Sequence, residues 1–151
     1  MSVLILSVML AAALSAVGAS RKGQVWNSDR LRAHYLASDL MTEILDRPYA
    51  APGDTPAFGP APSEVATGRS SFDDIDDYHG LVEQPPKDRN GNPIPGCTNW
   101  RREVRVAWVS PANLGSVLGS DGGLKRITVT VSRKGVILAE LVTIRCSEVT
   151  R

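Results

Sequence analysis

Residues 3–19 read VLILSVMLAAALSAVGA and contain no charged side chain. The run is apolar on every face, so its periodicity does not separate a strand from a helix. Seventeen residues that are rich in Leu, Met and Ala and free of proline favour a helix. At about 1.5 Å per residue such a helix spans roughly 26 Å, the short limit for crossing a bilayer. The sequence therefore predicts a hydrophobic transmembrane helix over residues 1–20.

Two other interpretations of this run stay open. Val17 and Ala19 are small enough for signal-peptide cleavage before Ser20, although the basic segment that precedes the apolar part of a signal peptide is missing. A buried core helix is the other alternative. Arg21 and Lys22 follow the run directly. By the positive-inside rule they would hold that end of the helix in the cytoplasm unless stronger basic residues precede the run.

The helix is predicted to continue through residues 21–47, because Pro48 is the first proline of the chain. Apolar residues recur three and four apart, which is the spacing of an amphipathic helix: Trp26, Ala33, Leu36, Ala37, Leu40, Met41, Ile44 and Leu45. On the opposite face, Asp39 and Glu43 are expected on one solvated stripe. The apolar stripe must therefore rest on another element of the protein.

Residues 48–99 are interpreted as a variable loop region rich in proline and glycine. This segment holds nine of the ten prolines, which argues against long regular elements. A connection of this length is too long to be a passive linker. Asn90 and Gly91 predict a tight turn within it.

Four aspartates interleave with apolar residues in the run from Phe72 to Gly80: Asp73, Asp74, Asp76 and Asp77. Several carboxylates on one flexible loop are the ligands that calcium prefers, which makes this run a candidate calcium site. The spacing does not match an EF-hand, because the glycine and the terminal glutamate of such a loop are missing. We favour the alternative of a solvated acidic turn, or of salt bridges to arginines of the following strand, Arg101, Arg102 or Arg105.

Residues 100–151 are predicted to form an antiparallel sheet. Apolar side chains alternate at period two over residues 100–109 and again over 127–131, which is the pattern of half-buried strands. Residues 132–135 supply a hairpin turn, and residues 136–146 return as a third strand. One face of this meander can cover the helical stripe. The predicted fold class is therefore α+β, with a long N-terminal helix packed on a small antiparallel sheet of three to four strands.

The two cysteines, Cys97 and Cys146, fall at opposite ends of this meander, because its first and third strands run parallel. Their Cα atoms would then lie farther apart than the roughly 7 Å that a disulfide allows. A different strand order would bring them together, so the pairing stays open at this point.

Composition and motifs exclude several functional classes. The chain has 151 residues, room for about one ordinary domain, and its net charge of +1 excludes a histone-like nucleic-acid binder. The only histidines, His34 and His79, have no zinc-ligand spacing to other histidines or to the cysteines. No serine lies in a nucleophile-elbow motif, and no glycine-rich stretch forms a phosphate-binding loop. We therefore expect no catalytic residues, no cofactor and no nucleic-acid partner.

A hydrophobic helix with an amphipathic continuation, a variable loop and a small sheet resembles type IV pilins and type II secretion pseudopilins. Residues 3–11 are similar to the segment that follows the prepilin processing motif. Residues 37–45 with Pro48 and Tyr49, and the later run 72–80, are most similar to minor pilins of the MSHA type. The resemblance implies a pilin-like fold and a minor pilin or pseudopilin function without catalysis.

The same resemblance implies a location and partners. It suggests a single-pass bacterial inner-membrane precursor that a prepilin peptidase trims and N-methylates. Residues 1–20 would then pack against other pilins in a filament core, with the C-terminal module in the periplasm or on the filament surface. The alternative function is a secreted binding domain whose signal peptide has been cleaved.

The chain departs from the family pattern at its N-terminus. The basic leader, the glycine of the cleavage site, the first phenylalanine of the mature protein and the glutamate that follows it do not occur before residue 3. We expect the true start to lie upstream of Met1, which would also explain the orientation of the helix, because an upstream basic leader holds that end inside. The alternative is a copy that has lost processing and assembly.

Overall fold

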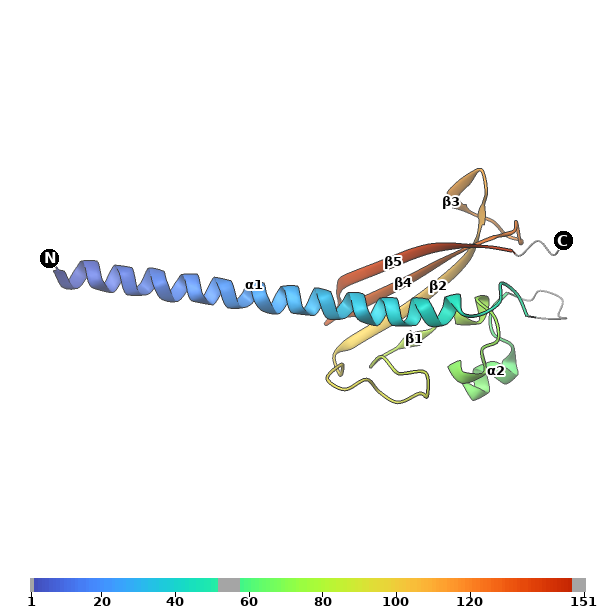
Figure 1. Ribbon diagram of the computed structural model, residues 1–151, viewed down its shortest axis with the longest axis horizontal. Helices are drawn as coiled ribbons and strands as arrows, with labels where there is room; N and C mark the ends of the chain where they lie inside the picture. The colour runs from blue at the N-terminus through green and yellow to red at the C-terminus, as the bar shows by residue number, and fades with distance from the viewer. Residues whose placement is uncertain (1, 52–57, 148–151) are drawn as a thin grey trace. The chain divides into compact units, whose positions relative to one another are not determined.

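The computed structural model describes the backbone of residues 2–51 and 58–147, with side chains at positions 9, 14 and 15 and from position 20 onward within these ranges. The chain forms two compact units, residues 1–32 and 33–151. Helix α1 (Ser2–Leu45) contributes to both units, and the remaining elements belong to the second (Figure 1).

The first unit consists of the N-terminal part of α1. Its described apolar side chains are solvent-exposed: Met9, Leu14, Val25, Trp26 and Leu31. Across the residues that the structure describes, no helix combines the length and the apolar character needed to cross a membrane. Most side chains of the predicted transmembrane run, residues 3–19, lie outside the described set.

The second unit contains a five-stranded antiparallel sheet. Its strands are β1 (Val82–Glu83), β2 (Trp100–Ser110), β3 (Asn113–Val117), β4 (Leu124–Arg133) and β5 (Val136–Cys146). The order is β1-β2-β4-β5, and β3 pairs with the end of β2 (Figure 1). The predicted meander of three long strands is confirmed, whereas β1 and β3 were not predicted because their short segments lack an alternating apolar pattern.

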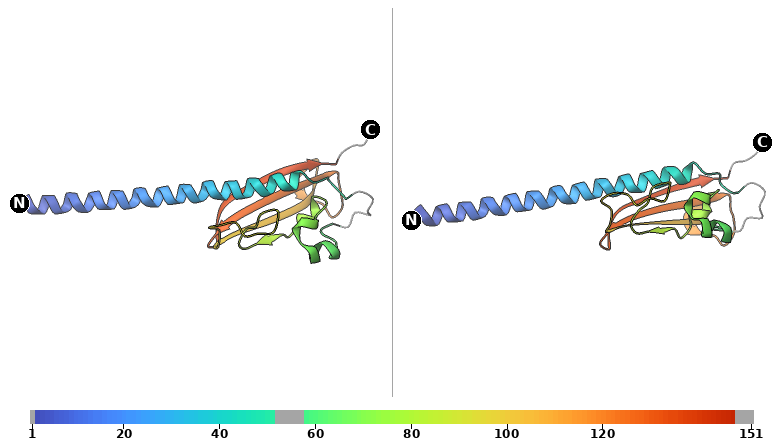
Figure 2. Two further views of the ribbon diagram at one scale, coloured as in Figure 1. Left: turned by 60° about the horizontal axis from the view of Figure 1, so that its bottom comes forward. Right: turned by 90° about the horizontal axis from the view of Figure 1, so that it is seen from below.

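The C-terminal part of α1 runs along one face of this sheet (Figure 2). Most of its predicted apolar stripe is buried there: Ala33, Leu36, Ala37, Leu40, Met41 and Ile44. Leu45 is partly buried against the same core, whereas the prediction is wrong for Trp26, which is 48% exposed. The opposing face of the sheet supplies alternate residues of β2 and β4: Val104, Val106, Ile127, Val129 and Val131. Each fully buried aliphatic side chain stabilises the fold by about 1.5–3 kcal/mol. The α+β class with a pilin-like arrangement is therefore confirmed, with four to five strands rather than three to four.

Residues that favour turns follow the end of α1 and connect β4 to β5. The helix ends at Leu45, and Pro48 follows it, as predicted. At the hairpin between β4 and β5, Lys134 and Gly135 both adopt positive φ, at 51° and 81°. Two successive residues with positive φ match the right-handed twist of the flanking strands, which explains the tight connection.

The described part of the loop region, residues 48–51 and 58–99, contains only short elements. These are α2 (Pro62–Thr67), the 3-10 turns η1 (Arg69–Ser71) and η2 (Asp76–Tyr78), and β1. The predicted Asn-Gly turn is confirmed, because the Gly91 N–H donates to the Asp88 carbonyl at 3.1 Å and Gly91 has a φ of 84°. The region is thus irregular but fastened at several points.

Candidate functional site

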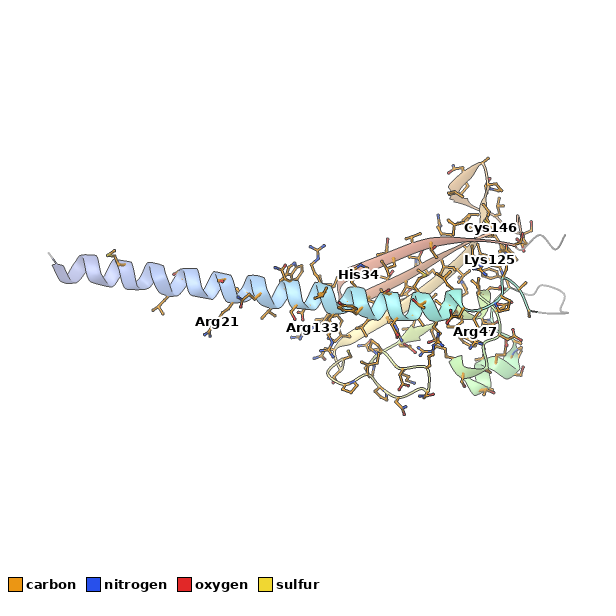
Figure 3. All side chains as sticks on the ribbon, in the orientation of Figure 1. Arg21, His34, Arg47, Lys125, Arg133 and Cys146 are labelled. Atoms are coloured by element: carbon orange, nitrogen blue, oxygen red, sulfur yellow. The ribbon has the colours of Figure 1, made fainter. Side chains whose placement is uncertain are left out.

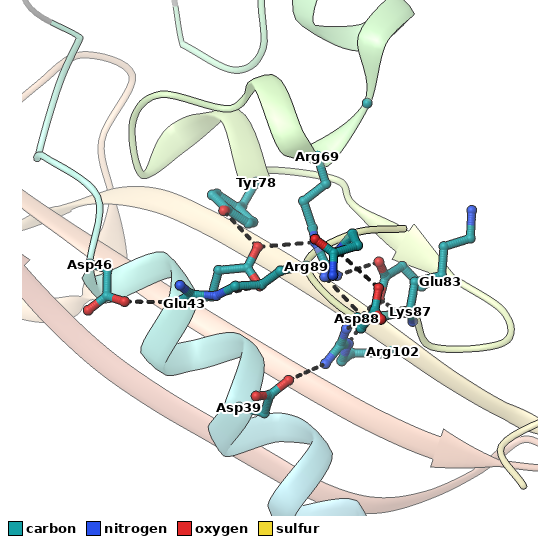
Figure 4. A network of polar contacts seen from close by, with 12 residues as sticks. Asp39, Glu43, Asp46, Arg69, Tyr78, Glu83, Lys87, Asp88, Arg89 and Arg102 are labelled. Carbon is teal, nitrogen blue, oxygen red and sulfur yellow. Dashed lines mark hydrogen bonds and ion pairs between the residues drawn. The ribbon is translucent and has the colours of Figure 1, made fainter. Parts of the chain in front are cut away.

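A buried ionic network joins the loop region to the helix and the sheet. We call it the junction cluster and define it by four side chains: Glu43 of α1, Arg69 of η1, Glu83 of β1 and Arg102 of β2. Figure 4 shows how these side chains converge from four separate elements. The two carboxylates and two guanidinium groups balance one another in charge, which is the condition under which buried ions are tolerated.

Glu83 lies between the two arginines. Arg69 Nη1 is 2.5 Å from Glu83 Oε1, and Arg102 Nη2 is 2.6 Å from Glu83 Oε2. Arg69 Nε reaches back to Glu43 Oε1 at 3.1 Å. The cluster is therefore one continuous chain of charge-assisted contacts, in which each charge has at least one partner of opposite sign.

The side chain of Arg102 is fully buried and connects the junction cluster to the backbone of neighbouring elements. Its Nη1 donates to the backbone carbonyl of Leu36 in α1 at 3.0 Å, and its Nη2 donates to the carbonyl of Lys87 at 2.7 Å. A single side chain thus bonds helix, loop and β1 at once. Asp39 lies at the rim, 3.8 Å from Arg102 Nη1.

The prediction that Asp39 and Glu43 share a solvated stripe is confirmed for Asp39 and wrong for Glu43. Asp39 is exposed, but Glu43 is only 5% exposed. The loop region supplies the cover, because Arg69 pairs with Glu43 and the Tyr78 hydroxyl donates to Glu43 Oε1 at 3.1 Å. Burial raises the pKa of the Tyr78 phenol above its ordinary value. Helical periodicity alone could not reveal a cover contributed by distant loop residues.

A second buried cluster lies around the acidic run. We call it the lysine cluster and define it by Tyr49, Asp74, Asp76 and Lys125. Lys125 of β4 is 2% exposed and donates from Nζ to Asp76 Oδ1 and to the Tyr49 carbonyl. Its ammonium group also lies 4.3 Å from the centre of the Tyr49 ring, a cation–π arrangement. Asp76 Oδ2 accepts the Gly59 N–H at 3.2 Å, which leaves both carboxylate oxygens occupied.

The predicted solvated turn is wrong for three of the four aspartates, because Asp74, Asp76 and Asp77 are all buried. Their carboxylates accept backbone N–H groups of the same run. Asp74 Oδ1 accepts from Asp76 at 2.8 Å, and Asp77 Oδ2 accepts from Asp73 at 2.8 Å. These bonds shape the chain into η2, and the short local spacing of the acidic residues is what allows them.

The predicted salt bridges to the arginines of β2 are also wrong. Arg102 pairs with Glu83, while Arg101 and Arg105 pair with Glu103 of their own strand. The cation that meets the acidic run is Lys125 instead. Lys125 and Asp76 are 49 residues apart in the chain, so no local pattern in the sequence pairs the two.

The calcium candidate stays a prediction, with a revised set of ligands. Carboxylate oxygens of Glu64, Asp73 and Asp77 lie within 4.8 Å of one another. Both carboxylate oxygens of Asp74 and of Asp76 are occupied by backbone N–H groups or by Lys125. The hydrogen bonds to Asp77 and Glu64 use one oxygen of each. A calcium ion at this loop would therefore draw on Glu64 rather than on Asp74 and Asp76, because hard cations need free carboxylate oxygens.

Burial raises the pKa of the Asp74 carboxyl to about 6, and the neighbouring Asp76 carboxylate adds to the shift. This value is above the unfolded value of about 3.9, so the folded protein holds the proton more tightly. The resulting stabilisation is complete below about pH 4 and is lost as the pH rises through about 6.

Replacing Asp74 with Asn is expected to remove this titration. Between about pH 4 and about pH 8, the free energy of unfolding of the Asp74→Asn variant should gain about 1–2 kcal/mol relative to the native chain, with an allowance for solvent screening. Urea denaturation at both pH values in buffer with a chelator measures this difference. Asp88→Asn is the control, because hydrogen bonds from Asn92 lower the pKa of the Asp88 carboxyl. This group stays ionised between about pH 4 and about pH 8, so the difference between Asp88→Asn and the native chain should hardly change over that range. A constant difference for Asp74→Asn across this range would contradict the assignment.

The remaining candidate residues are distributed over the second unit. Cys97 is buried and Cys146 is exposed, and they form no disulfide. The Trp100 N–H donates to the Cys97 carbonyl beside the start of β2, whereas Cys146 ends β5, near Lys125 (Figure 3). The predicted placement at opposite ends of the meander is therefore confirmed. His79 Nδ1 accepts the Val106 N–H at 3.3 Å, which occupies one of its ring nitrogens.

The face of the sheet that is turned away from α1 carries a hollow of about 650 Å³. Its lining mixes charges of both signs, with Glu103, Arg105 and Arg126 among strand threonines. Arg126 Nη1 also donates to the Leu114 carbonyl at 3.0 Å, which ties β3 to this face. Such a surface suits contact with another polar protein surface more than enclosure of an apolar small molecule.

Comparison of the chain with models of protein families, with curated proteins and with solved structures finds no match.

Proposed function

We propose that the chain is a minor pilin-like or pseudopilin-like structural subunit of a type IV pilus or a type II secretion filament, without catalytic activity. The observation that carries the proposal is that the two ends of α1 have different properties. One end of this helix bears the uncharged run 3–19, and the other end buries its apolar stripe on the sheet. Such a helix fits a filament subunit. Its apolar run would leave the bilayer and pack against the helices of neighbouring subunits, while its other end stays in the core of the subunit.

The loop region supports the same proposal. The junction cluster and the lysine cluster fasten residues 58–99 to the helix and the sheet, so this irregular segment has a defined surface. A fixed surface built from irregular chain suits specific contacts, because binding then orders few additional residues. In the proposed filament, other pilins or pseudopilins contact residues 1–20, and the second unit faces the periplasm or the filament surface.

The mature N-terminus tests this proposal. We expect mass spectrometry of protein isolated from its native cells to find an N-methylated phenylalanine upstream of Met1 and an intact apolar run. Co-purification with other pilins should accompany that result. A terminus at Ser20 would instead support the secreted binding domain, because a signal peptidase would have removed the run, and the filament proposal would fall.

A further inference from the structure

The two edges of the sheet differ greatly in length. At one edge lies β1, which has only two residues, Val82 and Glu83. At the other edge lies β5, with 11 residues. Short edge strands are a common protection against unwanted pairing, and only the β1 edge has this protection.

The outer edge of β5 has a regular backbone that is suited to pairing. Its register with β4 is unbroken from Ala139 to Cys146, after an irregularity opposite Val131 and Ser132. Within the described residues, the backbone pairing of β5 is with β4. Residues 136–146 contain no proline, glycine or lysine, the residues that would discourage a further strand.

Side chains along this edge are also unusually apolar for an exposed strand. Val136, Ile137 and Val142 are 50%, 62% and 55% exposed. Val142 stands opposite Thr128 on the face of the sheet that is turned away from α1, inside the regular part of the strand. The edge therefore offers a row of backbone donors and acceptors, with exposed apolar side chains along it.

We propose that β5 pairs antiparallel with β5 of a second copy of this chain, which joins the two sheets into one. Backbone donors and acceptors in a row select an extended strand as the occupant. Within the described part of the chain, β5 is the one long edge, so the matching edge is that of another copy. The short β1 edge offers too few bonds for a head-to-tail arrangement, so the pairing closes as a two-fold dimer.

The register of this pairing follows from charge and exposure. If the two-fold axis passes through Val142, this side chain meets the partner's Val142 on the same face of the joined sheet. Glu140 then lies opposite the partner's Ile144, and Arg145 lies opposite the partner's Ala139. Like charges are thereby kept apart, which a two-fold axis through Glu140 or Arg145 would not achieve.

Substitution on the two edges tests the dimer in the full chain, solubilised in detergent. The dissociation constant is measured by sedimentation, with melting curves to verify folding. We expect Val142→Lys to weaken dimerisation by about tenfold or more, because two ammonium groups would meet at the seam. Val82→Lys is the matched control on the short edge, since Val82 is 48% exposed, and it should leave the dissociation constant unchanged.

Disulfide trapping provides a second readout that does not depend on a destabilising charge. In a Cys146→Ser background, Val142→Cys should form a crosslinked dimer on mild oxidation, because directly opposed cross-strand Cβ atoms lie about 4.5–5.5 Å apart, close to the roughly 3.5–4.5 Å that a disulfide spans. Val82→Cys in the same background should not. A monomeric native chain, a dimer that Val142→Lys leaves intact, or the lack of a Val142→Cys crosslink would overturn the proposal. The mature N-terminus is measured separately, so failure of this dimer and failure of the filament proposal are distinguishable.

Discussion

Replacing Arg102 with alanine is expected to lower the free energy of unfolding by about 3–5 kcal/mol, because the change leaves the buried junction cluster with an uncompensated negative charge. Glu83 would keep Arg69, but the cluster would then hold two acidic groups and one basic group. The Leu36 and Lys87 carbonyls would also lose their donor. The loss is large relative to the roughly 5–15 kcal/mol of total stability that is typical of a domain.

Arg105 is the matched control for this prediction, since it is an arginine on the same strand with an exposed side chain that pairs with Glu103 at 3.2 Å. Exposed ion pairs contribute about 0–1 kcal/mol, so Arg105→Ala should fall in that range. Urea denaturation of both variants measures the comparison. Equal losses for the two variants would show that Arg102 does not hold the junction cluster together.

A double variant separates charge from packing at the same site. Arg102→Met with Glu83→Leu removes one charge of each sign and leaves the Glu43–Arg69 pair intact. We expect the double variant to be more stable than Arg102→Met alone, because apolar replacement of a complete buried pair is often neutral or stabilising. A double variant that loses the sum of both single changes would indicate that the two side chains act independently.

The fold was largely accessible from the sequence because its elements are long and periodic. The helical stripe up to Ile44 and the alternation in β2, β4 and β5 each repeat often enough to specify an element and its buried face. The five residues of β3 are exposed throughout, and the two of β1 are too few to show a period. Short strands form because they pair with neighbouring strands, and a local sequence pattern contains no information about that pairing.

The buried polar clusters were much less accessible, because their partners are distant in the chain. Glu43 and Tyr78 are 35 residues apart, and Lys125 and Asp76 are 49 apart. A charged residue on a helix or a loop is exposed in most proteins, so a solvated position is the natural expectation for Glu43 and Asp76. Arg102 and Lys125 are exceptions. The strand alternation places them on the same face of the sheet as Val104 and Ile127, so the sequence could have identified them as buried charges.

Replacing Lys125 with methionine is the other change with a large expected effect. It should lower the free energy of unfolding by about 3–5 kcal/mol at neutral pH. Methionine has a similar length, so the change mainly removes the charge and the donor. Asp76 would then lose its cation while it remains beside the buried Asp74 carboxyl. Two neighbouring carboxyl groups without a cation disfavour ionisation, and ionisation at pH 7 makes the fold less stable.

The pH dependence of this loss distinguishes charge from packing. Lys125 lowers the pKa of the Asp74 carboxyl, so this carboxyl holds its proton more tightly in Lys125→Met. At about pH 4 the Asp74 carboxyl is neutral, so the difference between the native chain and Lys125→Met should shrink. Arg126→Met is the control, because Arg126 is the next residue, points to the opposite face and donates to the Leu114 carbonyl at an exposed site. It should cost about 1 kcal/mol or less at both pH values. A loss for Lys125→Met that stays constant with pH would mean that Lys125 serves packing rather than neutralisation of the acidic run.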